Sequence, residues 1–156
     1  MFSNRWSGGH SSLFKSIKEP NVPSRQSDNE LKVLATANAL IEAFGNHRRD
    51  EYFSFFAPEA LFIFHSSDKV FYARNEYEKE WLGWEEAGLR FVACVSMDQR
   101  VTQLGPDIFL FTHRCRTTVE QGGDSEQLDE RESIVFRIGT DGTCLAVHEH
   151  LSPFPV

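Results

Sequence analysis

Two histidines near the C-terminus have the spacing best suited to chemistry. His148 and His150 stand two positions apart in a run of alternating side chains, and residues at that spacing in a β-strand point to the same side. An imidazole titrates near neutral pH, so a histidine in a pocket can accept or donate a proton. We predict that His148 and His150 are catalytic, with Arg131 as a third polar group beside them.

A hairpin upstream of the histidines determines which residues share their face. Asp141-Gly142 is a strong hairpin signal. Whether the loop is this pair or the four residues 139–142, odd positions before it pair with even positions after it. One face then carries Arg131, Ser133, Val135, Arg137, Cys144, Ala146, His148, His150 and Ser152, and the other Glu132, Ile134, Phe136, Ile138, Leu145, Val147, Glu149 and Leu151. The first face is polar with small residues, so we predict that it forms a pocket wall.

Further side chains are predicted to contact a ligand in this pocket: His65, Tyr77, Trp81, His113, Cys115 and Ser133. Tyr77 and Trp81 lie on one helix with Trp84, and these aromatic residues could instead form the core face of that helix, which is the commoner outcome. His113, Cys115 or His65 could join the two C-terminal histidines in a metal site, which needs a third ligand that the spacing does not fix. Cys115 could act as a nucleophile beside those histidines, although a buried cysteine is commonly a small apolar residue. We predict no metal and no cofactor.

The carboxylates near these residues have ordinary interpretations. Asp98 would lie opposite His113 if the strands on either side of residues 104–107 pair evenly, and would then orient the imidazole. Glu132 and Glu149 alternate away from the histidine face, so we expect them to be solvated or to form salt bridges between subunits. Arg114 and Arg116 are expected on the face opposite His113, where a pair with one of those glutamates is the ordinary outcome.

The elements that must position these residues follow from the periodicity. Ser27 and Glu30 form a capping box that opens a helix with apolar residues at helical spacing as far as Phe44. A short helix over 50–56 ends near Pro58, a strand covers 60–65, and Asn75 caps a helix over 76–87. Period-two segments then cover about 89–103, 107–120, 129–139 and 143–151. Helices followed by an antiparallel meander indicate an α+β domain with the helices on one face of the sheet.

Composition restricts the class of protein. The chain has 156 residues, enough for one domain, and its net charge of −7 divides into +3 over residues 1–27 and −10 over the remainder. So acidic a domain disfavours nucleic-acid binding, and no apolar run could span a membrane. Three cysteines without a CxxC motif fit a cytoplasmic protein. We predict a flexible basic arm over 1–27, for which a transit peptide is the alternative, and a domain over 28–156.

The order of these elements and the C-terminal hairpin resemble the SnoaL-like superfamily. One strand of the family pattern carries Arg, a small hydroxyl residue and Val, which match Arg131, Ser133 and Val135 here. After Asp-Gly, the next strand of the pattern carries Trp, Ile, His, His and Ser at every second position, which match Cys144, Ala146, His148, His150 and Ser152. The clear departure is Cys144 in place of Trp. The resemblance implies the nuclear-transport-factor-2-like, ketosteroid-isomerase-like fold: a cone-shaped, curved antiparallel sheet packed against three helices from the N-terminal half. It specifies no reaction, since one fold hosts many functions.

The resemblance also implies a homodimer through the outer sheet face. An exposed strip of Ile134, Phe136, Ile138, Leu145 and Val147 on that face would need cover. We predict a small-molecule-pocket protein performing acid–base lyase, isomerase or cyclase chemistry on a hydrophobic carbonyl compound. A non-catalytic ligand-binding or dimeric assembly module and a His-based metal-dependent enzyme are the alternatives.

Overall fold

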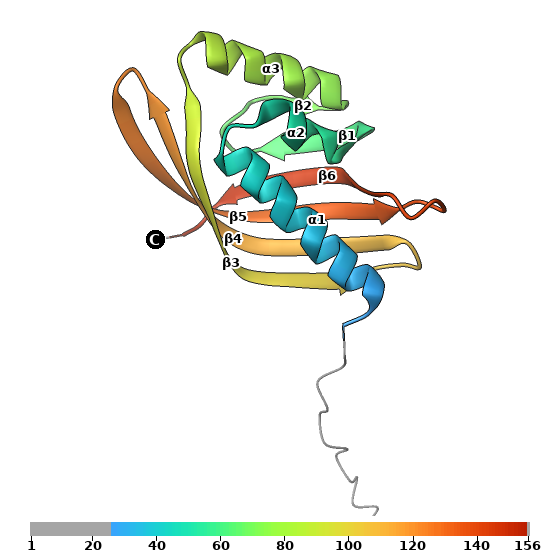
Figure 1. Ribbon diagram of the computed structural model, residues 1–156. Helices are drawn as coiled ribbons and strands as arrows, with labels where there is room; N and C mark the ends of the chain where they lie inside the picture. Colours follow the sequence, from blue (N-terminus) through green and yellow to red (C-terminus); the bar gives the residue numbers. More distant parts are fainter. Residues whose placement is uncertain (1–25, 156) are drawn as a thin grey trace, which may run out of the picture.

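The computed structural model describes residues 26–155, in which three helices pack against one face of a curved six-stranded sheet (Figure 1). The elements are α1 (Asp28–Gly45), α2 (Arg49–Ser54), β1 (Phe56–Phe64), β2 (Val70–Phe71), α3 (Arg74–Glu86), β3 (Arg90–Gln103), β4 (Ile108–Gln121), β5 (Asp124–Ile138) and β6 (Cys144–Pro153). The predicted α+β class is confirmed. The predicted arm lies outside the described residues, apart from Gln26 and Ser27.

The sheet has the strand order β2-β1-β6-β5-β4-β3. Strands β3 to β6 form the predicted antiparallel meander. Strand β1 pairs with β6 in parallel, so the sheet is mixed and not wholly antiparallel. None of the helices among residues 26–155 is long and apolar enough to cross a membrane.

Helix α1 begins and ends where its sequence signals place it. Ser27 accepts a hydrogen bond from the Glu30 backbone N–H at 3.1 Å, and the Glu30 carboxylate accepts one from the Ser27 N–H at 2.9 Å, which completes the capping box. At the other end the helix passes so close to β3 that a Cβ on Gly45 would lie 2.6 Å from the backbone nitrogen of Cys94. Glycine therefore lets α1 lie directly on the sheet.

Several predicted boundaries differ from the structure, and the helix predicted over 50–56 already ends at Ser54. Strand β1 starts at Phe56, and Pro58 lies where its pairing with β6 shifts register, a position at which a strand tolerates proline. Helix α3 starts at Arg74 after Ala73, so Asn75 is not its cap. Strand β5 starts at Asp124, because Gly122 and Gly123 adopt φ values of 61° and 91° and make a tight two-residue turn.

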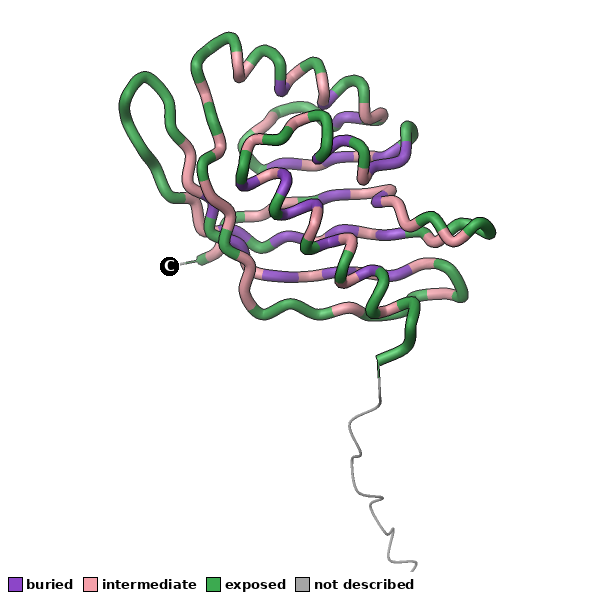
Figure 2. The backbone as a smooth tube through the Cα atoms, viewed as in Figure 1, coloured by how far each residue is buried: buried purple, intermediate pink, exposed green. Residues whose placement is uncertain are grey.

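The helices cover the sheet face that we had predicted to be the outer one. Ile134 and Phe136 are 0% exposed beneath the helices, together with Phe109 and Phe111 on β4. Figure 2 shows the buried positions along the central strands where the helices lie over them. Ile134 and Phe136 of the predicted outer strip are thus core, because apolar side chains gain more from burial than polar ones do.

Candidate functional site

The β5–β6 hairpin departs from simple alternation twice. Ile138 pairs with Cys144, so the loop has five residues and the parity predicted for a two- or four-residue loop is reversed near the turn. Phe136 then pairs with Ala146 and Val135 with His148, which leaves Val147 unpaired as a β-bulge and reverses the parity again. Beyond the bulge the predicted pairing holds, whereas Cys144 and Ala146 lie on the other face from that predicted.

The predicted catalytic residues lie on the outer face, away from the helices. Arg131, Ser133, His148 and His150 do share one face, as alternation predicted. The expectation that this face lines the pocket was wrong, since Ile134 and Phe136 on the opposite face are the ones covered. Of the two imidazoles, His148 Nδ1 lies 2.9 Å from the Leu61 carbonyl oxygen, and His150 is exposed.

A cavity of about 90 Å³ lies on the inner face, between the sheet and the three helices. Its wall is mainly apolar and aromatic, and three carboxyl groups interrupt it: Glu130 and Glu132 from β5 and Glu149 from β6. All three glutamates are buried, with 6%, 8% and 3% of their surface exposed. Within residues 26–155, no lysine, arginine or histidine side chain lines this cavity.

The six predicted ligand contacts are divided among several environments. Tyr77 and Cys115 line the cavity. Trp81 is fully buried among aromatic rings, which was the alternative interpretation. His113 is buried behind the cavity wall. His65 does not line the cavity itself, but its Nε2 lies 2.6 Å from Oε1 of Glu130, which does. Ser133 is on the outer face, so the structure does not bring these residues together.

Glu149 is the least exposed of the three glutamates that line the cavity. The Tyr52 hydroxyl donates a hydrogen bond of 2.7 Å to its Oε2. Burial raises the pKa of Glu149 well above its usual range, and the neighbouring charge of Glu132 raises it further. Burial likewise raises the pKa of Glu132 to about 8, against a lowering by its hydrogen bond with Glu149. Burial therefore favours the protonated form of both carboxyl groups.

His113 lies behind Glu132, with none of its side chain exposed. Its Nε2 makes a short hydrogen bond with Glu132 Oε2, and its Nδ1 lies 2.6 Å from Ser96 Oγ. Burial lowers the pKa of His113 to about 4, so a neutral imidazole meets a protonated carboxyl and the two do not form an ion pair. The predicted partner, Asp98, is instead exposed in a bulge of β3.

Cys115, the predicted nucleophile, lacks the surroundings that would activate its thiol. Hydrogen bonding with Cys94 and burial together raise the pKa of Cys115, which keeps its thiol protonated. Its predicted bases, His148 and His150, lie on the other side of the sheet. Among residues 26–155, no group of three His, Cys, Asp or Glu side chains is arranged to hold a metal ion.

Two further predictions about charged residues can be compared with the structure. Arg114 and Arg116 lie on the face opposite His113 as predicted, but both pair with Asp129, at 3.2 and 3.1 Å. Glu132 and Glu149, predicted to be solvated or at a subunit contact, are instead part of the cavity wall. The sequence did carry a signal for this. Glu132 is two residues before Ile134 on the same strand and Glu149 pairs with Ile134, so both glutamates share the most apolar face of the hairpin.

Comparison with known proteins agrees with this architecture. The family model for the SnoaL-like domain matches residues 33–156. The chain belongs to the SnoaL-like family. No curated relative matches the sequence.

Solved structures with this fold are distant in sequence. A ketosteroid isomerase-like protein from Erwinia carotovora atroseptica superposes with a TM-score of 0.74 at 14% identity, over 84% of this chain and 100% of its own. ActVI-ORFA from Streptomyces coelicolor gives 0.65 at 14% identity, over 81% and 97%. A protein from Catenulispora acidiphila in complex with S-DNPA gives 0.66 at 13% identity, over 81% and 93%. At these identities the likeness establishes the fold alone.

Proposed function

We propose that this SnoaL-like protein binds a hydrophobic carbonyl compound in the inner cavity and catalyses proton transfer on it, as a lyase, isomerase or cyclase does. The observation that carries the proposal is the pair of buried carboxyl groups, Glu132 and Glu149, in an otherwise apolar and aromatic wall. A carboxylic acid that keeps its proton near neutral pH can donate it to a carbonyl oxygen. The cavity thus offers an acid beside a surface that excludes water.

Strand β5 also carries a carboxyl group that could act as the base in this proton transfer. Glu130 lies two residues before Glu132 on β5, also lines the cavity, and is hydrogen-bonded to His65. An acid at the carbonyl oxygen and a second carboxyl group able to take a proton from the adjacent carbon are what enolisation requires. In this arrangement Glu132 and Glu149 act as the acid, and Glu130 accepts the proton.

The electrostatics of the cavity restrict its ligand. Three carboxyl groups line it, and among the described residues no basic side chain does. A carboxylate or phosphate ligand would enter with no opposite charge to replace its lost hydration, which is costly in an apolar site. The aromatic rings of Tyr77, Trp84 and Phe91 instead offer flat apolar surface. The ligand we propose is therefore uncharged, planar and hydrophobic.

The test uses 2-tetralone, a planar ketone with exchangeable protons beside its carbonyl. In D₂O, wild-type protein should bind 2-tetralone, seen as a raised thermal midpoint, and should accelerate deuterium incorporation at the α-carbon, followed by NMR. The variants Glu132→Gln and Glu130→Gln should keep the fold but no longer accelerate deuterium incorporation. The variant His148→Asn should accelerate it as wild type does. 2-Naphthoate, a carboxylate of similar size, should not bind. Binding without accelerated exchange in wild type would contradict catalysis and favour a binding module.

We further propose the homodimer that the family resemblance implies, through a corrected set of residues. Within residues 26–155 no helix covers the outer face. This face presents partly buried apolar side chains from three strands: Leu61, Ile63, Val135, Leu145 and Val147. These would meet their counterparts in a second copy of the chain, with His148 and His150 among them. Ile134 and Phe136, the residues first assigned to this contact, belong to the core.

The cysteines support the proposed cytoplasmic location. Cys94, Cys115 and Cys144 are all free. Cys94 and Cys115 both line the cavity without a disulfide between them; the Cys94 sulfur accepts a hydrogen bond from Thr117 Oγ1, and the Cys115 thiol donates one to the Glu130 carbonyl oxygen. Adjacent thiols that remain reduced fit a reducing compartment.

A further inference from the structure

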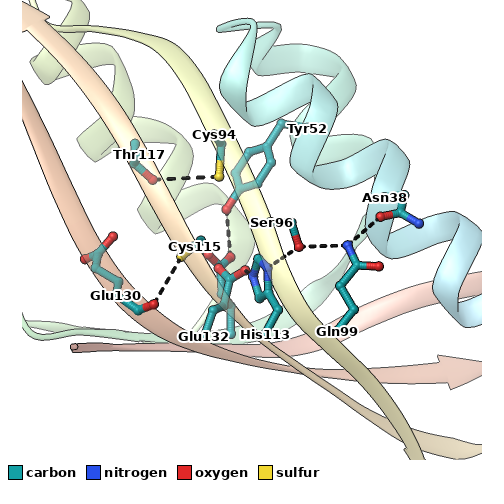
Figure 3. Close-up of polar contacts among 11 residues, drawn as sticks. Asn38, Tyr52, Cys94, Ser96, Gln99, His113, Cys115, Thr117, Glu130 and Glu132 are labelled. Carbon is teal, nitrogen blue, oxygen red and sulfur yellow. Dashed lines mark hydrogen bonds and ion pairs between the residues drawn. The ribbon is translucent and has the colours of Figure 1, made fainter. Parts of the chain in front are cut away.

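A line of hydrogen-bonded side chains leads from the cavity carboxyls to the protein surface, on the side of α1 and β3 (Figure 3). Behind Glu132 it continues through His113 and Ser96, and Gln99 Nε2 lies 2.7 Å from Ser96 Oγ. Gln99 also donates to Asn38 Oδ1 of α1, at 2.8 Å, and both amides are exposed. Neither His113 nor Ser96 lines the cavity, so this line is separate from the space that a ligand would occupy.

A β-bulge in β3 builds the outer end of this line. Met97 pairs with Arg114 and Arg100 with Thr112, so Asp98 and Gln99 together oppose the single residue His113. Asp98 takes the left-handed conformation with φ of 55°, which aspartate tolerates. In a regular strand, residues three apart point to opposite faces, but the bulge brings both Ser96 and Gln99 to the His113 side.

We propose that His113 and Ser96 form a proton relay through which Glu132 exchanges its proton with solvent while a ligand fills the cavity. This inference rests on the proposed function, because it supplies the route by which the buried acid is restored between turnovers. His113 and Ser96 touch no ligand in this arrangement. They act through Glu132 and are positioning residues.

The protons balance in two states of the line. In the first, the Glu132 carboxyl donates to His113 Nε2, and the Nδ1–H of the ring donates to Ser96 Oγ. In the second, Glu132 is ionised and accepts from Nε2–H, while Nδ1 accepts from the Ser96 hydroxyl. The states differ by one proton, which leaves Glu132 for Nε2 as the Nδ1 proton passes to Ser96 and the serine hydroxyl proton passes to water. Both hydrogen bonds of the imidazole are kept with their directions reversed, and Gln99 Nε2 donates to Ser96 Oγ in both states.

The surroundings allow the imidazole to pass a proton without retaining it. The titratable groups that face Glu132 and His113 are Glu149 from β6, Glu130 from β5, Tyr52 from α2, and the thiols of Cys94 and Cys115 from β3 and β4. Burial lowers the pKa of His113 far enough that the imidazolium is not a populated resting state. A ring that stays neutral and changes tautomer is the expected carrier.

The first test follows the tautomer of His113 by NMR of protein labelled with ¹⁵N-histidine. As pH rises through the range in which Glu132 ionises, the ring proton should move from Nδ1 to Nε2 without an imidazolium intermediate. In Glu132→Gln the side-chain amide donates to Nε2 at every pH, so the ring should keep its Nδ1 proton throughout. A single tautomer across the range in wild type, or an imidazolium at neutral pH, would overturn the relay.

The second test removes the link to solvent at Ser96. Ser96→Ala should slow exchange of the His113 ring N–H with water roughly tenfold or more, and Ser96→Thr, which restores a hydroxyl, should recover the wild-type rate. Ser152→Ala, on β6 of the same sheet and outside the line, is the matched control and should have no effect. An unchanged exchange rate in Ser96→Ala would refute the relay. If wild type shows the tautomer change but no exchange on 2-tetralone, the relay stands and the proposed reaction fails.

Discussion

Replacing Glu132 with glutamine should change the pH dependence of stability in a definite direction. Below about pH 4.5 the Glu132 carboxyl is protonated in both the folded and the unfolded chain, so it contributes no pH dependence. Between that value and its folded pKa of about 8, the unfolded chain releases a proton that the folded protein keeps, and the free energy of unfolding falls as pH rises. Above pH 8 both states are ionised and the dependence levels off.

The size of the effect follows from the difference between the two pKa values. A separation of about 3.5 pH units at roughly 1.4 kcal/mol per unit gives about 5 kcal/mol between pH 4.5 and 8, comparable to the whole stability of many domains. Glutamine has the shape of the protonated acid and does not titrate. Glu132→Gln should therefore match wild type at low pH and exceed it increasingly as pH rises.

Urea denaturation of both proteins at a series of pH values from about 4.5 to 9 measures this difference. Glu59→Gln is the control, because Glu59 is exposed and its hydrogen bond to Arg137 lowers its pKa, so any small effect has the opposite sign. A free-energy difference between Glu132→Gln and wild type that stays constant with pH would refute the reasoning. A free-energy difference that falls as pH rises would refute it as well, because an ion pair between Glu132 and a charged His113 would give that result.

Two other substitutions test the assignment of the sheet faces. Phe136→Ala should cost about 3–5 kcal/mol of unfolding free energy, because it empties a fully buried site. The neighbouring Val135→Ala should cost about 1 kcal/mol or less. Similar costs for the two variants in urea denaturation would contradict the assignment. Val135→Asp should convert the proposed dimer to a folded monomer in light scattering with unchanged circular dichroism, since it buries an unpaired charge in the contact. A wild-type monomer at micromolar concentration would rule out the dimer.

The sequence was sufficient to predict the fold class and most elements. The capping box at Ser27 and the period-two segments after Leu89 depend on local chemistry, which sequence carries directly. The predicted start of the third period-two segment, at about residue 129, is wrong because the tight turn at Gly122-Gly123 lets β5 begin at Asp124. Strand β2, only two residues long, has no periodicity to detect.

The site was predicted on the wrong face for a physical reason. Alternation shows which residues share a face but not which face the helices cover. The choice depended on interpreting a polar face as a pocket wall, although Ile134 and Phe136 gain most from burial. The bulge at Val147 and the bulge at Asp98–Gln99 arise from tertiary pairing, and they bring His113 and Ser96 into one hydrogen-bonded line with Glu132.

The central claim is that the cavity holds protonated carboxyl groups at neutral pH. Infrared spectroscopy of protein labelled with ¹³C at the glutamate carboxyl carbon tests it most directly. Wild type at pH 7 should show the carbonyl stretch of a protonated carboxylic acid, and this band should weaken in Glu132→Gln and in Glu149→Gln, persist in His148→Asn, and shift when 2-tetralone binds. Absence of that band from the wild-type spectrum at pH 7 would contradict the account.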